Sequence, residues 1–185
     1  MATKGKREPI PAAPLLNKYM DVLSDAEVRQ SDIAFVLIMG AFLENVMITL
    51  LSNFFVKCPA AKKVFEIKGT LDSFSKCNEV ARCLGLFPES LSNNLKIVAK
   101  IRNRFAHAHE PIGFADEQIK AWSLSLTLPD SPQLVSGTIL SGNDLQEWLK
   151  QQNAKTRFAS IASFMFKRLW ITAFHASRCK DEKKW

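Results

Sequence analysis

Apolar residues recur three and four positions apart along most of this chain, which is the spacing that places them on one face of an α-helix. One such set ends just before Gly85, a residue type that commonly terminates helices: Leu71, Phe74, Cys77, Ala81 and Leu84. Another follows Pro88, which suits a first helical turn: Leu91, Leu95, Val98, Ile101 and Phe105. The sequence therefore predicts two consecutive helices packed as a hairpin, the second ending before Pro111.

Two longer segments are predicted to form the central pair of helices. The first spans residues 31–56 and begins with Ser31, a favourable N-cap, and Asp32, which suits a first helical turn. The second spans residues 156–179, where these residues form an apolar face: Phe158, Ile161, Ala162, Met165 and Leu169. Helical periodicity in both segments predicts that they pack against each other in the core.

Shorter helices are expected over residues 15–24, over 116–126 and after residue 143. Residues 128–142 are rich in proline, glycine and serine and are expected to form a loop, with a short strand over 134–140 as the alternative. No other strand is expected. The fold class is therefore all-α, a single irregular bundle of about six helices.

The length and composition favour one domain. A chain of 185 residues, 47% of them apolar, is long enough for one substantial core. We expect a flexible basic arm over residues 1–14, where three prolines interrupt regular structure, and a frayed lysine-rich tail over 181–185. The helical domain is expected to span residues 15–180.

One apolar run, residues 33–56, has the length of a membrane-spanning helix. Glu44 stands near its centre, where an acidic residue costs up to about 3 kcal/mol on membrane insertion, and Asn45 and Asn53 add to that cost. We therefore expect this run to be the buried central helix of a bundle and not a membrane anchor.

Charge and cysteine content narrow the classes of function. The chain has 25 basic and 18 acidic side chains, a formal net charge of +7, which favours contact with phosphates or acidic partners. Because these basic residues are mostly scattered among acids, direct nucleic-acid binding is not favoured. The four cysteines form no CxxC pair and there are three histidines, so we expect neither a metal site nor a cofactor. Free thiols and a polar N-terminus lead us to expect a reducing cytoplasm.

The most specific local motif lies at residues 101–109, where Arg102 and Asn103 are followed by the sequence Phe-Ala-His ending at His107. This helix end resembles that of the mannitol operon repressor family, and also the Arg-x4-His motif of the HEPN superfamily of helical nucleases and toxins. Further stretches support the first resemblance: residues 42–45, 69–75, 84–86 and 113–117. The resemblance covers about residues 32–119 and implies a regulator linked to a sugar-alcohol operon. It does not itself imply an enzyme.

Two interpretations of this motif remain open at the level of sequence. In a metal-free ribonuclease or toxin, His107 would transfer protons while Arg102 holds the scissile phosphate. The HEPN resemblance implies a polar residue after the arginine, a position that Asn103 occupies. Residues five positions apart on a helix diverge by about 140°, so the helix must end between Arg102 and His107, or a second chain must complete the site. In the alternative, Arg102 forms a buried pair with Glu44 in the central helix, next to Asn45, and His107 caps the helix end. We favour this structural interpretation and expect no enzymatic activity.

Two further patterns bear on partners. Residues 80–92 imitate a helix-turn-helix, but Asn94 stands where that motif places a buried aliphatic residue, so a direct operator-DNA binder is only the second alternative. The last long helix carries more aromatic residues than one face can bury: Phe158, Phe164, Phe166, Trp170 and Phe174. We therefore expect a homodimer. The sequence as a whole predicts a regulator of transcription that acts through a protein partner.

Overall fold

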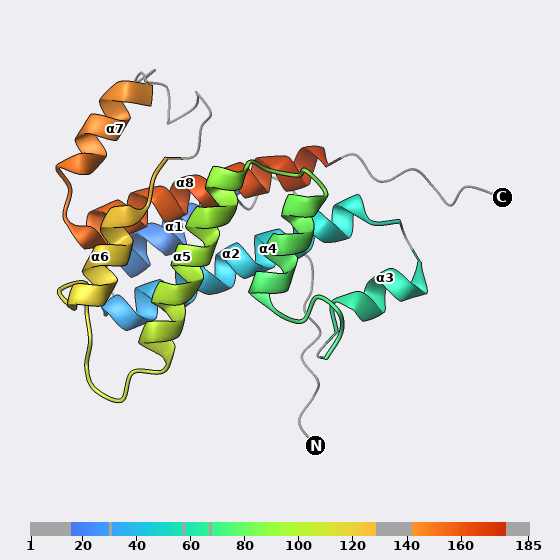
Figure 1. Cartoon of the computed structure of the whole chain (residues 1–185), viewed down its shortest axis with the longest axis horizontal. Helices are drawn as coiled ribbons and strands as arrows, with labels where there is room; N and C mark the ends of the chain where they lie inside the picture. The colour runs from blue at the N-terminus through green and yellow to red at the C-terminus, as the bar shows by residue number, and fades with distance from the viewer. Residues whose placement is uncertain (1–15, 30, 57, 67, 129–141, 177–185) are drawn as a thin grey trace.

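The computed structural model describes residues 16–29, 31–56, 58–66, 68–128 and 142–176 (Figure 1). These residues form eight α-helices and no strand, which confirms the all-α prediction: α1 (Leu16–Arg29), α2 (Asp32–Phe54), α3 (Pro59–Val64), α4 (Phe74–Cys83), α5 (Glu89–Ala106), α6 (Glu117–Ser125), α7 (Gly142–Lys150) and α8 (Ala154–His175). The expected arm, the tail and the alternative strand over 134–140 lie outside the described residues.

The observed boundaries differ from the predicted ones in three places. Helix α1 is longer than residues 15–24, and α3 was not predicted at all. Helix α8 begins two residues earlier than expected because the Asn153 side chain caps it, accepting the Thr156 N–H at 2.9 Å. It ends at His175, and residues 177–179 lie beyond the described part.

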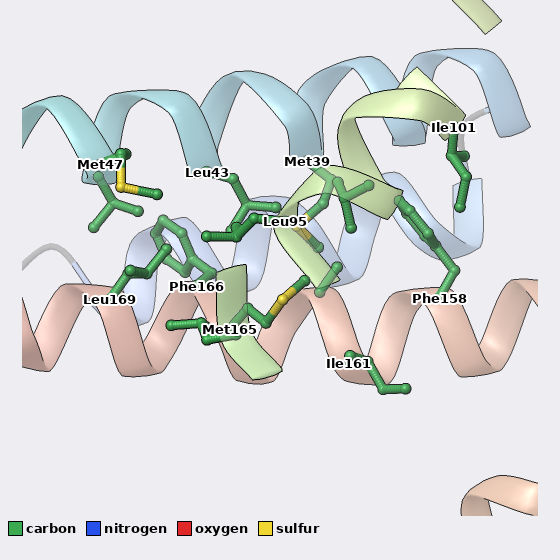
Figure 2. Close-up of a cluster of buried hydrophobic side chains, with 14 of the residues drawn as sticks. Met39, Leu43, Met47, Leu95, Ile101, Phe158, Ile161, Met165, Phe166 and Leu169 are labelled. Atoms are coloured by element: carbon green, nitrogen blue, oxygen red, sulfur yellow. The ribbon is translucent and has the colours of Figure 1, made fainter. Parts of the chain in front are cut away.

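Helices α2 and α8 form the centre of the bundle, as predicted, and α5 packs against α2 (Figure 1). Figure 2 shows side chains of α2 and α8 meeting between the two helices, with Leu95 and Ile101 entering from α5. These core residues are all essentially inaccessible to solvent: Met39, Leu43, Met47, Leu95, Ile101, Phe158, Ile161, Met165, Phe166 and Leu169. Burial of this apolar surface is the main stabilising contribution to the fold.

Helix α2 is the one helix in the described part of the chain that is long and apolar enough to cross a membrane. In this structure it is a core helix, contacted by α1, α4, α5 and α8, and more than half of its apolar window is buried inside the bundle. It begins as predicted, with the Ser31 side chain accepting the Ala34 N–H at 3.3 Å. Glu44 and Asn45 are both part-buried on its less apolar side.

Helices α4 and α5 form the predicted hairpin. Helix α4 ends at Cys83, and Gly85 follows with a φ of +68°, which is costly for residues with a side chain. The Leu86 N–H donates to the Ala81 carbonyl at 3.1 Å and closes the turn. Asn94 is buried in α5, where its side chain donates to the Thr127 carbonyl and accepts the Thr127 N–H at 3.2 Å. Asn94 therefore anchors the segment after α6 to the hairpin.

The aromatic residues of α8 are better covered than the sequence suggested. Three of the five are buried: Phe158, Phe166 and Trp170. Tyr19 of α1 packs against both Phe166 and Trp170, with ring centroids 6.0 and 5.5 Å away, and Phe114 packs against Phe158 at 5.4 Å. Phe164 is part-buried. Of the five aromatic residues that were expected to exceed one buried face, Phe174 alone is largely exposed, at 56%.

Candidate functional site

The end of α5 determines how Arg102 and His107 are related. The helix continues to Ala106, and His107 is the first residue beyond it, its N–H donating to the Asn103 carbonyl at 3.0 Å. The helix thus ends between Arg102 and His107, but only at Ala106, and the residues from Arg102 to Ala106 keep the helical geometry that turns successive side chains apart. His107 is exposed at the C-cap position, where the structural interpretation placed it.

Arg102 extends from α5 across to α2 and forms the predicted pair with Glu44. Its Nη2 lies 3.4 Å from Glu44 Oε2, and its Nη1 donates to the Asn103 side-chain oxygen at 3.1 Å. The pair is half-buried and not fully buried, since the Arg102 side chain is 34% exposed and that of Glu44 18%. Arg102 therefore keeps contact with solvent while it neutralises the acid in the central helix.

Gly40 makes this crossing of Arg102 over α2 sterically possible. A Cβ atom at position 40 would lie 2.9 Å from Arg102 Cγ, closer than carbon atoms approach without displacement. Sequence analysis assigned no role to Gly40. The sequence did contain an indication of this role. Glycine is disfavoured in the middle of a helix, and where it occurs there it commonly lets another segment pack closely against the helix backbone.

A hollow of about 170 Å³ lies between α2, α4 and α5, next to this crossing. Its lining combines two segments that supported the family resemblance, residues 73–75 and the pair at 102–103: Gly40, Ser73, Phe74, Ser75, Val98, Ala99, Arg102 and Asn103. None of these lining residues is acidic. His107 is not among them, so it does not line this hollow together with Arg102 and Asn103.

Asn45 and the histidines have more limited roles. The Asn45 carbonyl accepts the Thr49 hydroxyl at 2.8 Å within α2. His107 and His109 are both exposed. Among the described residues, no three His, Cys, Asp or Glu side chains lie close enough together to hold a metal ion.

Residues 113–117, another segment of the resemblance, connect α5 to α6 and α2. The Phe114 N–H donates to Asp32 Oδ2 at 3.3 Å, and the other oxygen of Asp32 pairs with Lys155 of α8 at 2.9 Å. Asp116 caps α6 and lies 3.6 Å from a nitrogen of Arg104. Near this cluster, burial raises the pKa of Glu27, and the ammonium of Lys155 partly offsets that shift. This segment therefore holds the start of α6 against α2 and α5.

Comparison with known proteins gives one structural likeness. No family model and no curated protein sequence matches the chain. The structure is similar to a chain in the X-ray structure of the MtlR-HPr complex from Escherichia coli, with a TM-score of 0.61 and 16% sequence identity. The likeness covers 85% of this chain and 99% of that chain. The two proteins therefore share a fold across nearly the whole of the solved chain.

Proposed function

We propose that this protein is a cytoplasmic regulator of transcription of a sugar-alcohol operon, and that it acts by binding a protein partner and not by catalysis or by reading operator DNA. The observation that carries the proposal is the fold shared with a chain of the MtlR-HPr complex. That structure is of a complex between two proteins, and four short segments and the end of α5 in this sequence resemble the mannitol operon repressor family.

The distribution of exposed apolar side chains supports a protein partner. Ile33 and Leu37 lie one turn apart on α2 and are 41% and 37% exposed, and Ile171 and Phe174 on α8 are 43% and 56% exposed. Small groups of exposed aliphatic and aromatic residues are typical of surfaces that another protein covers. Arg102 and Glu44, by contrast, are engaged with each other.

The proposal is tested by titrating this protein with HPr from the same organism in an isothermal calorimeter. We expect saturable binding with a dissociation constant in the micromolar range, corresponding to about 8 kcal/mol of binding free energy. The double variant Ile33→Ser/Leu37→Ser should weaken binding, because these two residues form the exposed apolar group of α2. Failure of the wild-type protein to bind HPr at millimolar concentration would refute the proposed partner.

Ribonuclease activity is the second candidate, because Asn103 and His107 are both exposed at the end of α5 and a second chain could complete a site. We expect no cleavage of single-stranded RNA by the wild-type protein. We also expect His107→Ala to change the free energy of unfolding by only about 0.5 kcal/mol, since the side chain is exposed at a helix terminus. Both are measured on the same preparations, by gel electrophoresis of labelled RNA and by urea denaturation. RNA cleavage that disappears in His107→Ala would overturn the assignment as a non-enzyme.

We further propose that the protein is a homodimer. The remaining exposed apolar residues of α8, Ile171 and Phe174, are adjacent on its last turn and would be covered by a second copy. Light scattering at tens of micromolar protein should give twice the monomer mass, and Phe174→Ser should reduce it. A monomer mass for the wild-type protein under these conditions would contradict the prediction.

A further inference from the structure

The hollow between α2, α4 and α5 has no role in binding a protein partner as proposed above. Its volume of about 170 Å³ is roughly ten times the space that one water molecule requires. It is also smaller than the pockets that hold large cofactors or drug-sized ligands, which begin at about 300 Å³. The size therefore fits a small metabolite.

The polar groups of the hollow are predominantly hydrogen-bond donors. Arg102 carries five N–H groups, and its two bonds to Glu44 and Asn103 leave others available. The Ser73 hydroxyl accepts the Lys76 N–H at 3.4 Å and keeps its own proton to donate, and Ser75 adds a second, exposed hydroxyl. Glu44 lies behind Arg102 and does not line the hollow. A site with a guanidinium and hydroxyls but no lining carboxylate favours an anion.

The other half of the lining is apolar. Phe74, Val98 and Ala99 contribute carbon surface, and Gly40 presents bare backbone opposite Arg102. The ligand that matches both halves has a charged head group and a short carbon skeleton. Because donors reach the hollow from both α4 and α5, a tetrahedral group with three free oxygens satisfies more of them than a planar carboxylate does.

We propose that this hollow binds the phosphate group of a small phosphate monoester, with Arg102 holding the anion and Ser73 and Ser75 donating to its oxygens. The α5 surface supports an anionic ligand, since Lys100, the neighbour of Ala99 in the lining, is exposed there and forms no ion pair with any described residue. Anion binding is measured in the absence of HPr, so its outcome is independent of the partner experiment.

A small molecule accounts for this surface better than nucleic acid does. Tight binding of a nucleic-acid backbone draws on about six to ten phosphate contacts. On α4 and α5, Lys76 and Arg104 are already paired with Asp72 and Asp116. The exposed cations that remain near the hollow are too few for a backbone contact of that extent, whereas one guanidinium suffices for one phosphate.

The first experiment blocks the hollow without changing its charge. Ala99→Met places a longer side chain in the lining, and Ala106→Met makes the same change on the exposed end of the same helix. Wild type, Ala99→Met and Ala106→Met are titrated by ¹H–¹⁵N NMR with glycerol 3-phosphate, inorganic phosphate and, as the uncharged control, glycerol. We expect saturable shifts of the amides at 73–76 and 102–103 with both phosphates in the wild type and in Ala106→Met. Ala99→Met should bind at least tenfold more weakly.

The second experiment removes the charge of Arg102 together with that of Glu44, so that neither residue is left as an unpaired charge. The double variant Glu44→Gln/Arg102→Gln is neutral at both positions, and Lys96→Gln removes one cation of α5 that does not line the hollow. We expect phosphate binding to be lost in the double variant and nearly unchanged in Lys96→Gln. Three results would overturn the proposal. The first is amide shifts in the wild type that do not saturate with phosphate, and the second is equal weakening of binding in Ala99→Met and Ala106→Met. The third is that a short single-stranded RNA shifts the amides at 73–76 and 102–103 when neither phosphate does.

Discussion

Replacing Phe166 by alanine is expected to lower the free energy of unfolding by about 3–5 kcal/mol, the cost of removing a large aromatic side chain from a core that cannot collapse around the cavity. Phe166 is fully buried on α8, and its ring lies 6.0 Å from that of Tyr19, 6.0 Å from Phe42 and 5.7 Å from Trp170. One substitution therefore removes contacts with α1, α2 and its own helix. Urea denaturation followed by circular dichroism measures the loss.

Phe174→Ala is the matched control, because it makes the same chemical change two turns further along the same helix. Its side chain is 56% exposed in the single chain, so at protein concentrations too low for the proposed dimer to form we expect a change within about 0.5 kcal/mol. Equal losses in the two variants would contradict the packing described for α8. A larger loss in Phe174→Ala that grows with protein concentration would measure the contribution of this residue to the proposed dimer.

Features that depend on local sequence were predictable. Ser31 caps α2 and Gly85 terminates α4 because both effects act within a few residues of the position itself. The apolar stripe of α5, from Leu91 to Phe105, is buried because a period of 3.6 residues defines a face regardless of what covers it. The same reasoning identified α2 and α8 as the longest apolar helices and hence as the central pair.

Other features were not predictable, either because the residue type gives no signal in the sequence or because the contact forms only in the folded chain. Helix α3 is capped by the thiol of Cys58, which accepts the Ala61 N–H at 3.4 Å and is not a residue type that signals a cap. Gly69 is required because a Cβ there would lie 2.5 Å from the carbonyl oxygens of Lys63 and Val64, a contact visible only after folding. The excess of aromatic residues on α8 was overestimated because Tyr19 and Phe114, which cover them, come from remote segments.

The candidate site also has one part that the sequence predicted and one part that it did not. Its charged pair could be predicted, because an acid in the middle of a buried helix requires a cation and Arg102 was the one basic residue on a neighbouring apolar stripe. The hollow beside it could not, because it is formed by Gly40 from α2, Ser73 and Ser75 from the start of α4, and Ala99 from α5. No pattern in the sequence relates residues 40, 73 and 99, and only the crossing of three helices brings them together.

Replacing Arg102 by alanine is expected to lower the free energy of unfolding by roughly 2 kcal/mol, between the 0–1 kcal/mol of an exposed ion pair and the 3–5 kcal/mol of breaking a buried one. Glu44, only 18% exposed, would lose its cation, and the alkyl part of Arg102 would no longer pack over Gly40. Glu44→Ala should cost less, about 1 kcal/mol, because the 34% exposed guanidinium can turn toward water.

The double variant Glu44→Ala/Arg102→Ala separates the pairing from the packing. If the two charges stabilise each other, the double variant is less destabilised than the sum of the single variants by about 1 kcal/mol. That coupling should shrink in 1 M salt, where charges this close to solvent are screened, while the packing loss of Arg102→Ala remains. Urea denaturation of the four proteins at low and high salt measures both contributions. Strictly additive losses at low salt would mean that Arg102 stabilises the fold by packing alone, and the acid in α2 would then be tolerated by its contact with solvent.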